Sequence, residues 1–497
     1  MIAGFDLKKY WIVMVIALVT ILGLVTNHHV EAEEAAPQER MESVEEGPKR
    51  GDKLVIGLDD TFAPMGFRNG QNEIVGFDID LAQAIAEIYG WELDFQPIDW
   101  AMKETELNSG NIDLLWNGVG ITPEREEQML FSQPYFESPN IVITKKGSPI
   151  KELSDLVGKT ISTQSGSTTA EDIKGWPNQL YQKLAQKPVL YSSYNEVFAD
   201  LDSGRVDAVV TDYTYGHYIM EVRGEEKYDS FVDPSKEPEQ MAVAMRKSAS
   251  GLKTMIDQGL DQVKANGKYD EIVAKWFGEN RQVASQENII QKILPSLWSG
   301  FKLTLVLFVL VLALSLPLGF LIAIMRVFSP KLIQWLIEGY VFIMRGSPLM
   351  LQLMMVFFGL PYLGINLDRF TAALIAFVIN YAAYFAEIFR GGITSVPQGQ
   401  YESIKVLGIG WQRGFRRIIL PQVMKITLPS VGNEVIALVK DTSLVYVIGL
   451  GELLRAGSIA ANTYATIIPY LVCGVFYLIF TAFVTLALRR IEYRVSW

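Results

Sequence analysis

Long apolar stretches in the second part of the sequence constrain the fold more than any other feature. There are five, each of about 20 residues or more, near residues 297–325, 334–362, 370–390, 427–450 and 467–488. A helix of about 20 apolar residues crosses the roughly 30 Å hydrocarbon core of a bilayer. We therefore predict that residues 290–497 form an all-α membrane domain of about five transmembrane helices, in contact with lipid.

The charge of the chain divides at nearly the same place. Residues 1–290 contain 47 of the 55 acidic and 27 of the 44 basic residues, so they carry a formal charge of −20, whereas the remainder carries +9. This division predicts an aqueous part followed by a membrane part. The basic residues of the second part lie between apolar stretches, so the sequence indicates no nucleic-acid-binding surface.

The sequence offers few ligands for a metal. Its single cysteine, Cys473, lies inside an apolar stretch, and two of its three histidines are adjacent, at His28 and His29. A disulfide framework needs several cysteines, and a Cys/His metal site needs several such ligands. We therefore predict neither kind of site.

The N-terminus has the layout of a secretory signal over residues 1–32. Two lysines precede an apolar core at residues 11–25, and a cleavage-like sequence follows at residues 30–32. An uncleaved anchor stays open as the alternative, because the core approaches the length of a span. Both interpretations place the next domain outside the cell. Residues 33–51 are acidic, lack aromatic residues and are typical of a disordered linker.

Strand-like and helix-like segments alternate from residue 52 onward. KLVIGLD and ELDFQPI have strand patterns, and FDIDLAQAIAEIYG between them has helical spacing. A second series runs from DLVGKTISTQSGS to DAVVTDY. Such alternation predicts mostly parallel sheets with helices on both faces, here as two α/β lobes within residues 52–285.

Two apolar strands flank the second series, IVITKKG at 141–147 and MAVAMRK at 241–247. We interpret them as two crossings between the lobes, so that lobe 1 comprises about 52–143 and 243–280, and lobe 2 about 144–242. Ligands in such folds bind in the crevice beyond the carboxyl ends of the strands. A two-strand hinge lets the lobes close on a ligand.

Basic residues agree with one orientation of the apolar stretches. If the lobes lie outside, the inner ends of the first, third and fifth stretches carry Arg326, Arg390 and Arg489. The outer loops carry only Arg369 and Arg455. This distribution matches the excess of Lys and Arg in cytoplasmic loops of membrane proteins.

The loop between the third and fourth stretches is basic and cytoplasmic in this orientation. Its spacing predicts helices over residues 400–407 and 411–419, with Gly408 and Gly410 permitting the turn between them. Pro421 is expected to end the second helix. Two interpretations follow from the spacing: an interfacial amphipathic loop whose arginines contact lipid headgroups, or a docking element for a cytoplasmic partner.

The run FAEIFRGGITSVPQGQYESIKVLGIGWQRGFRRIILPQ resembles the cytoplasmic coupling loop of ABC importer permeases of the polar amino-acid family, here residues 398–421. That family's pattern is Glu-Ala-Ala, three residues, Gly, nine residues, Ile-x-Leu-Pro. The sequence matches at Glu402, Ser403, Ile404, Gly408, Ile418, Leu420 and Pro421, with Ser403 and Ile404 replacing the two alanines. MRGSPLMLQ and KDTSLVYVIGLGELL are also similar to that family. The resemblance implies a type I permease whose loop docks on an ATP-binding subunit, and the bulkier Ile404 bears on that packing.

GFDIDLAQAIAE, ITPEREEQMLFSQPYF and SGRVDAVVTD resemble the amino-acid-binding proteins that feed such permeases. The resemblance implies a periplasmic-binding-protein-like (type II) fold. Arg125 stands at the family's carboxylate-binding arginine, and a carboxylate favours a planar bidentate donor. Ser167 and Thr168 match the family's other carboxylate contacts. By position alone, Arg125 is a first-turn helix residue paired with Glu126 or Glu127, and the serine is part of a capped loop.

The same resemblance implies an acceptor for the ligand amino group and a pocket for its side chain. Asp212 matches the amino-group acceptor, Asp59 a pocket position, and Phe62 an aromatic residue that covers the ligand. Each aspartate also fits the common role of a turn former. Gly118 would offer a backbone carbonyl. Gly120 departs from the family, which has Ser or Thr there, so water or another ligand orientation has to replace one hydroxyl contact.

Two tryptophans bear on specificity. Trp100 stands at a variable position of the family's side-chain pocket, and Trp116 is near it in sequence. For each, a pocket role and a core role both remain open. An aromatic pocket accepts many side chains, including a cation by stacking, so the resemblance predicts a polar amino acid without naming it.

Together the resemblances imply a fused subunit of an ATP-driven ABC importer that takes up an amino acid across a bacterial plasma membrane. We expect the binding domain outside, and the coupling loop and C-terminus in the cytoplasm. The sequence lacks a complete G-x-x-x-x-G-K-[ST] phosphate loop. We therefore expect ATP and Mg on a separate subunit, no catalytic residue and no cofactor in this chain, and a homodimer with two ATPase subunits.

Two other functions remain as alternatives. An amino-acid-gated channel or receptor with similar lobes predicts a carbonyl-lined filter, for which we find no motif. An enzyme related to the dehydratases that share the lobe fold predicts a catalytic acid in the cleft in place of an amino-acid clamp.

Overall fold

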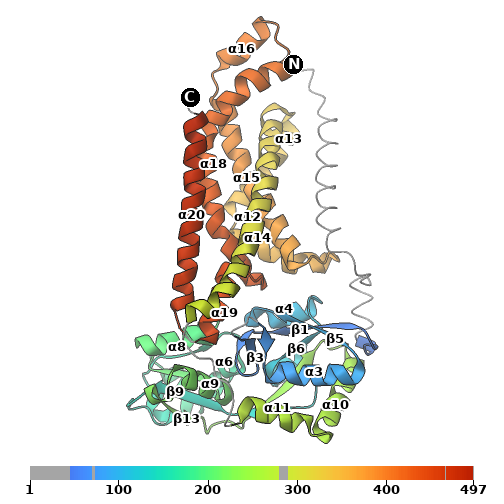
Figure 1. Ribbon diagram of the computed structural model, residues 1–497, viewed down its shortest axis with the longest axis vertical. Coiled ribbons are helices and arrows are strands. Elements are labelled where there is room, and N and C mark those ends of the chain that lie inside the picture. Colours follow the sequence, from blue (N-terminus) through green and yellow to red (C-terminus); the bar gives the residue numbers. More distant parts are fainter. Residues whose placement is uncertain (1–44, 70–72, 279–288, 465, 496–497) are drawn as a thin grey trace.

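The computed structural model describes residues 45–69, 73–278, 289–464 and 466–495. The predicted signal or anchor, residues 1–32, lies outside the described residues, as do residues 33–44 of the predicted linker. Figure 1 shows two α/β lobes at one end of an elongated helical domain, and helix α16 (Gln398–Val406) at the opposite end. This arrangement separates the two regions that the sequence singled out for function.

The described end of the linker packs against the first lobe. The indole nitrogen of Trp91 donates a hydrogen bond to the carbonyl of Pro48 at 3.2 Å. Glu45 forms an ion pair with the buried Arg246 at 3.0 Å. These contacts fix the last linker residues to the lobe that follows them.

The first lobe is built on a six-stranded sheet in the order β5-β1-β6-β14-β7, with β8 paired to β14. The strands are β1 (Lys53–Leu58), β5 (Glu92–Pro97), β6 (Leu114–Gly120), β7 (Leu130–Phe131), β8 (Phe136–Ser138) and β14 (Glu239–Met245). β5, β1 and β6 are parallel, whereas β14 is antiparallel to β6. The predicted strands KLVIGLD and ELDFQPI are confirmed as β1 and β5.

Helices and a small sheet complete the first lobe. The helices include α3 (Phe77–Tyr89), α4 (Lys103–Asn108), α5 (Pro123–Gln128), α10 (Ser250–Ala265) and α11 (Lys268–Phe277). The small sheet comprises β2 (Thr61–Phe62), β3 (Gly66–Arg68) and β4 (Ile74–Val75). The predicted helix FDIDLAQAIAEIYG is confirmed as α3, whose apolar face is buried against the sheet.

The second lobe is built on a five-stranded sheet in the order β11-β10-β12-β9-β13. Its strands are β9 (Asn140–Lys145), β10 (Ile161–Gln164), β11 (Val189–Tyr191), β12 (Ala208–Asp212) and β13 (Tyr228–Val232). Its helices include α6 (Thr168–Asp172), α7 (Leu180–Lys183), α8 (Tyr194–Ser203) and α9 (Tyr213–Arg223). Parallel pairing of β10 with β11 and β12 brings their carboxyl ends to one edge.

The chain passes between the lobes beside β8 and β14. β9 belongs to the second sheet and β14 to the first. At this passage Glu239, the first residue of β14, lies opposite Ser138, the last residue of β8. The chain therefore passes from one sheet to the other just before β9 and returns just before β14, so the segments 141–147 and 241–247 begin inside strands of one lobe each. Glu239, at the start of β14, lies at the return passage.

The helical domain contains three continuous helices long and apolar enough to cross a membrane. They are α12 (Ile289–Phe328), α15 (Arg369–Ser395) and α20 (Ile468–Val495). α15 is the most buried of the three, and Gly319 of α12 lies against Ala382 and Phe385 of α15. Small residues let helices approach closely within a membrane.

Two further candidate spans are bent, which the apolar stretches did not predict. α13 (Lys331–Gly346) turns by 106° into α14 (Leu349–Met354) and the π-helical turn η6 (Met355–Gly359). α18 (Leu420–Asp441) and η9 (Thr442–Ile448) turn by 56° into α19 (Leu453–Thr463). The predicted number of five spans is reached if each bent pair is one span.

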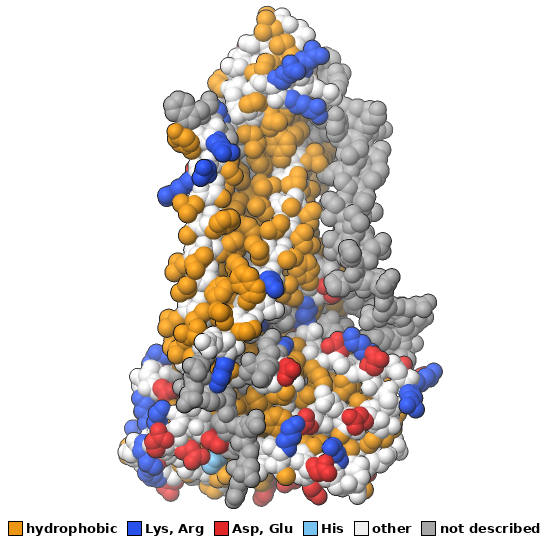
Figure 2. All heavy atoms as spheres, viewed as in Figure 1, with side chains coloured by type: hydrophobic (Ala, Val, Ile, Leu, Met, Phe, Trp, Pro, Cys, Tyr) orange, Lys and Arg blue, Asp and Glu red, His pale blue; other side chains and the backbone are white. Residues whose placement is uncertain are grey.

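The surface of the helical domain matches a membrane environment. Figure 2 shows hydrophobic side chains over its visible face, between the lobes and the end that carries α16. Lys and Arg side chains gather at that far end, whereas the lobes show mixed charges. Apolar side chains at this density on a surface favour contact with lipid.

Candidate functional site

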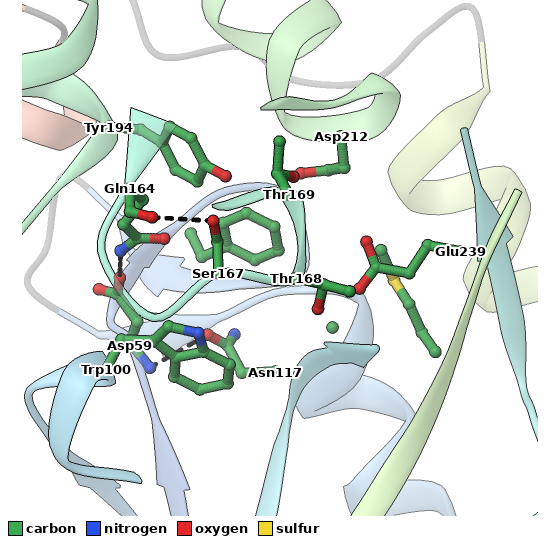
Figure 3. Close-up of a pocket in the computed structure, with 13 residues that line it drawn as sticks. Asp59, Trp100, Asn117, Gln164, Ser167, Thr168, Thr169, Tyr194, Asp212 and Glu239 are labelled. Carbon is green, nitrogen blue, oxygen red and sulfur yellow. Dashed lines mark hydrogen bonds between the residues drawn. The ribbon is translucent and has the colours of Figure 1, made fainter. Parts of the chain in front are cut away.

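The carboxyl ends of strands from both lobes surround one pocket (Figure 3). Its lining residues are Asp59, Phe62, Trp100, Asn117, Gly118, Gln164, Ser167, Thr168, Thr169, Tyr194, Asp212, Glu239 and Met241. Seven of the nine predicted ligand contacts are among them. The other two, Gly120 and Arg125, lie directly behind the lining, where the Arg125 guanidinium donates to the Gly120 carbonyl at 3.1 Å.

Arg125 joins the two lobes. It lies on α5 in lobe 1 and is only 4% exposed. Its guanidinium donates to the Thr168 hydroxyl at 2.8 Å and to the Gly166 carbonyl at 3.0 Å, both on lobe 2. Glu171 accepts a longer contact of 3.4 Å. The predicted alternative, a local pair with Glu126 or Glu127, is not the arrangement found, because the side chain is directed into the cleft.

Ser167 and Thr168 begin helix α6. The Ser167 hydroxyl caps this helix by accepting from the Ala170 amide at 3.1 Å, and it donates to the Gln164 carbonyl at 2.8 Å. Thr168 instead turns its hydroxyl to Arg125. The structure therefore gives Ser167 the capping role and places Thr168 beside the arginine.

Asp59 follows β1 and faces the second lobe. One of its carboxylate oxygens accepts from the Thr61 hydroxyl at 2.6 Å, and the other accepts from the Gln164 side-chain amide at 2.7 Å. Burial raises the pKa of Asp59, while the hydrogen bond from Thr61 and the nearby charge of Arg455 oppose that rise. A buried carboxylate is stabilised by a nearby cation.

Asp212 ends β12 and begins α9. Its carboxylate accepts from the Tyr215 amide at 3.0 Å, so it also caps the helix. Burial raises its pKa, against hydrogen bonds from Tyr215 and Thr214. In Figure 3, Asp212 and Glu239 lie on one side of the pocket, whereas Asp59 and Trp100 lie on the other.

Aromatic side chains from both lobes close one wall. Phe62 of lobe 1 stacks on Tyr215 of lobe 2 with ring centroids 5.4 Å apart, and Tyr194 lies 6.1 Å from Phe62. Trp100 lines the pocket. Trp116 belongs to the core of lobe 1, where its ring centroid lies 6.2 Å from that of Tyr135. Trp100 also packs in a core cluster of lobe 1, so it lies both in the core and on the pocket wall, whereas Trp116 lies in the core.

The glycines that follow Asn117 shape the floor. Gly118 has a positive φ of 58°, and its amide donates to buried Asp78 at 2.7 Å. At Gly120 the space of an added Cβ is already occupied, because the Glu239 carboxyl oxygen lies 1.6 Å from that position. Glu239 thus stands where the missing hydroxyl of Gly120 was expected.

Six lining residues were not predicted from the sequence: Asn117, Gln164, Thr169, Tyr194, Glu239 and Met241. Gln164 is the last residue of β10, so its place at a strand end was a usable signal. Glu239 and Met241 alternate along β14, which places both on one side of the strand. That signal required knowledge of how β14 pairs with β8 and β6.

The helical domain contacts the lobes through polar side chains. Arg455 of α19 forms an ion pair with Asp60 at 2.7 Å, and the Thr463 hydroxyl donates to the Arg68 carbonyl at 2.9 Å. Arg369 of α15 forms an ion pair with Glu106 of α4 at 2.8 Å. The two arginines predicted for the outer loops therefore both bind acids of lobe 1.

The two parts of the chain match two different families of known proteins. Residues 54–279 match the bacterial extracellular solute-binding proteins, family 3, and residues 315–497 match the binding-protein-dependent transport system inner membrane component. The arginine transport system permease protein ArtQ of Bacillus subtilis (strain 168) is 35% identical over 201 residues, which are 40% of this chain and 92% of that protein. The chain belongs to the amino-acid ABC importers.

Relatives of the importer's first half are binding proteins. The arginine-binding extracellular protein ArtP of Bacillus subtilis (strain 168) is 32% identical over 228 residues, 45% of this chain and 86% of that protein. A solved substrate-binding protein of an ABC uptake transporter from Streptococcus pneumoniae, with bound histidine, is 36% identical with a TM-score of 0.45 and covers 50% of this chain and 99% of its own.

The importer chain is a transport component for amino acids and not an enzyme, because both families are non-catalytic parts of ABC importers. It joins a solute-binding domain to a multi-pass permease domain. The channel and dehydratase alternatives are therefore set aside. Among the described residues, no group of three His, Cys, Asp or Glu side chains is placed to hold a metal ion.

The predicted coupling loop of the importer contains two short helices joined by a turn. α16 ends at Val406, and Gly408 takes a positive φ of 64° before α17 (Trp411–Gly414) begins. Ile404 is 1% exposed and packs against Gly414, where an added Cβ would lie 2.6 Å from it. The replacement of alanine by Ile404 thus concerns packing inside the loop, since this side chain does not face outward.

Pro421 does not end the second helix, so that prediction is wrong. A π-helical turn, η8 (Phe415–Ile419), leads directly into α18, and Pro421 lies in the first turn of α18. Proline is tolerated there because the first amides of a helix have no partner within it. Leu420 begins this helix, while Ile418 and Ile419 pack toward the core of the helical domain.

Proposed function

We propose that this chain captures a basic amino acid, with L-arginine the leading ligand, and delivers it to its own permease domain. The observation that carries the proposal is Asp59, a buried carboxylate on the pocket wall beside Trp100. A guanidinium pairs with a carboxylate through parallel hydrogen bonds and stacks on an aromatic ring. The names of ArtQ and ArtP, both arginine proteins, support the same ligand.

The other pocket residues suit the two charges that every amino acid carries. Arg125 and Thr168 provide donors for the α-carboxylate, next to the capped end of α6 at Ser167. Asp212 and the carbonyl of Gly118 provide acceptors for the α-ammonium. Phe62 covers the pocket from lobe 1 and contacts the aromatic rings of lobe 2. The ligand would thus be held by both lobes, and its binding would favour their closure.

The proposed domains follow from the same assignment. Residues 1–32 are a signal or anchor, 33–51 a linker, 52–285 the binding domain, and 290–497 the permease with the coupling loop at 398–421. A fused binding domain has a high effective concentration at its permease. The ion pairs of Arg369 and Arg455 with lobe 1 support this docked arrangement.

The permease would be driven by a separate ATP-binding subunit that holds ATP and Mg. This chain has Gly158-Lys159-Thr160, but Leu153 stands where a phosphate loop needs its first glycine. Loop residues Glu402 and Ser403 are exposed on α16, as are the hydrophobic side chains of Val406 and Leu407. We propose that this surface docks on the ATPase, and that two copies of the chain form the pore.

The proposed orientation places the lobes outside a bacterial plasma membrane and α16 in the cytoplasm with the C-terminus. Figure 1 supports it, because the lobes and α16 lie at opposite ends of the helical domain. Basic side chains gather near the α16 end (Figure 2), and an excess of Lys and Arg is typical of the cytoplasmic side of membrane proteins.

A thermal-shift screen of the full-length chain in detergent against the common L-amino acids tests the ligand. A ligand stabilises the folded state by mass action, so the shifts rank with affinity. We expect L-arginine to give the largest shift and L-lysine a smaller one. A largest shift with an acidic amino acid would contradict the assignment of Asp59.

A further inference from the structure

The Glu239 carboxyl fills a position that the amino-acid clamp leaves open at Gly120. An added Cβ at Gly120 would lie 1.6 Å from a carboxyl oxygen of Glu239 and 2.7 Å from the Thr168 hydroxyl oxygen. A serine or threonine side chain at position 120 would therefore reach the place that this carboxyl occupies. The carboxyl group and the hydroxyl of Thr168 flank the same point of the pocket.

The backbone holds Glu239 at this point. It is the first residue of β14, and it lies opposite Ser138 of β8, where the chain returns from lobe 2 to lobe 1. Its side chain lines the pocket and is turned toward Thr168 in Figure 3. Thr168 in turn accepts from Arg125 at 2.8 Å. Glu239 thus belongs to the carboxylate end of the proposed clamp, although it comes from the hinge.

We propose that Glu239 binds the α-carboxylate of the ligand as a neutral carboxylic acid, donating the hydrogen bond that a hydroxyl at position 120 would otherwise supply. The inference rests on the proposed function, because it uses the same pocket and the same ligand. A carboxylic acid has one O–H donor, whereas a carboxylate has none. The group is therefore useful to an anionic ligand only while it keeps its proton.

The electrostatic surroundings favour the protonated form. Burial raises the pKa of Glu239 to about 8, with Asp212 and Asp172 adding to the rise and Thr168 and Arg125 opposing it. No ion pair within 4 Å joins Glu239 to a cation among the described residues. The charged groups on the elements around it are Glu124 and Arg125 on α5, Glu171 and Asp172 on α6, Lys174 after α6, Asp212 at the end of β12, and Lys236 and Glu237 before β14.

Several of these charges are already paired with one another. Asp172 binds Lys236, and Glu171 contacts Arg125. The net influence on Glu239 is therefore that of a half-buried acid near Asp212. A ligand carboxylate arriving beside it raises its pKa further, because like charges at short distance disfavour ionisation. Ligand binding and retention of the proton thus favour each other.

The opposite arrangement, an ionised Glu239 that accepts from the ligand ammonium, predicts the opposite dependence on pH. A neutral donor is lost as pH rises through its pKa, so affinity falls. An ionised acceptor forms as pH rises, so affinity increases. The sign of the change in affinity between pH 7 and pH 9 therefore separates the two roles.

The experiment measures L-arginine affinity by calorimetry on the full-length chain in detergent, at pH 7 and pH 9, for wild type and Glu239→Gln. The amide of glutamine donates at both pH values. We expect the wild type to lose about tenfold more affinity than Glu239→Gln over this interval, since a group of pKa near 8 is about nine-tenths ionised at pH 9. The ligand ammonium titrates equally in both measurements and cancels in the comparison.

Equal pH dependence of the two proteins, or a gain of affinity in wild type relative to Glu239→Gln at pH 9, would overturn the role of Glu239. Loss of binding by folded Glu239→Gln at pH 7 would overturn it too. Glu237→Gln, two residues away and exposed, is the matched control and is expected to follow wild type. Failure of wild type to bind any amino acid would overturn the proposed function itself.

A second pair of variants tests the position independently of pH. Glu239→Ala is expected to weaken arginine binding. The double variant Gly120→Ser with Glu239→Ala is expected to recover it, because loss of the carboxyl leaves only the Thr168 hydroxyl, 2.7 Å from the added Cβ, to move aside before the serine hydroxyl donates. Recovery at both pH 7 and pH 9 would support the replacement of one donor by the other. Weaker binding by the double variant than by Glu239→Ala alone would contradict it.

Discussion

Arg455 of α19 forms an ion pair of 2.7 Å with Asp60, the residue next to the pocket aspartate Asp59. Asp60 is fully buried and also binds Arg68 at 2.7 Å. The charge of Arg455 is close enough to lower the pKa of Asp59. A single side chain of the permease therefore both holds lobe 1 and acts on the ligand pocket.

This relationship predicts opposite effects of Arg455→Met on uptake and on binding. Uptake by proteoliposomes that contain the ATPase is expected to fall about tenfold, because docking loses a buried ion pair. Arginine affinity of the full-length chain is expected to rise by about threefold to tenfold, because a cation near Asp59 opposes a cationic ligand by roughly 1 kcal/mol.

Arg369→Met is the matched control, because it removes a contact between the helical domain and lobe 1 that does not involve the pocket. Its partner Glu106 does not line the pocket. We expect lower uptake and unchanged arginine affinity. If Arg455→Met leaves uptake at the wild-type level, the ion pair with Asp60 does not contribute to transport.

Arg125→Ala is expected to abolish amino-acid binding. The substitution removes the guanidinium that donates to the hydroxyl of Thr168 and to the carbonyl of Gly166. These contacts lie behind the part of the pocket proposed to bind the α-carboxylate. Loss of a buried charged donor costs about 3 kcal/mol, or more than a hundredfold in affinity. Calorimetry on the full-length chain measures this loss.

Lys146→Ala is the control for a basic residue outside the site. Lys146 lies on lobe 2, and its exposed side chain binds Asp229 at 2.7 Å. It is expected to bind arginine as wild type does. Unchanged affinity of Arg125→Ala would remove Arg125 from the binding site.

Asp59→Asn is expected to weaken L-arginine binding by about thirtyfold and L-glutamine binding much less. The expected loss of about 2 kcal/mol is that of one charge-assisted contact. Burial raises the pKa of Asp59, so its charged form is lost as pH falls through that raised value. Wild-type arginine affinity should therefore fall more steeply with decreasing pH than that of Asp59→Asn. Parallel titrations of the two proteins would contradict a contact between Asp59 and the cation.

Local patterns explain the parts of the fold that were predicted from the sequence. KLVIGLD and FDIDLAQAIAEIYG became β1 and α3, because strand and helix periodicity depend on a few neighbouring residues. The five apolar stretches were predicted from composition, which does not show where a helix bends. Pro348 lies at the 106° bend between α13 and α14, and hydropathy alone did not show that the helix turns there.

The missed parts of the site depend on contacts between distant residues. Glu239 reaches Gly120 only because β14 returns from lobe 2 to pair with β6 and β8. Arg455 reaches Asp60 across 395 residues. The sequence showed that a hydroxyl was absent at Gly120, and the pairing of strands was needed to find what replaces it.

Gly408→Val is expected to uncouple ATP hydrolysis from uptake, whereas Gly410→Val is expected to resemble wild type. Neither glycine has another atom within 4 Å of an added Cβ, so steric room is equal at the two positions. Their backbones differ, because Gly408 has a φ of +64° and Gly410 a φ of −56°. A valine at positive φ costs roughly 1–2 kcal/mol, and relief of this strain changes the angle between α16 and α17.

The measurement compares ATP hydrolysis and arginine uptake in proteoliposomes that contain the ATPase, with arginine affinity as the control. Affinity should stay at the wild-type level in both variants, because the loop and the lobes lie at opposite ends of the helical domain (Figure 1). A lower ratio of uptake to hydrolysis in Gly408→Val alone supports the proposed docking of α16. Equal ratios in the two glycine variants and wild type would show that the turn geometry at Gly408 does not transmit ATPase closure to the permease.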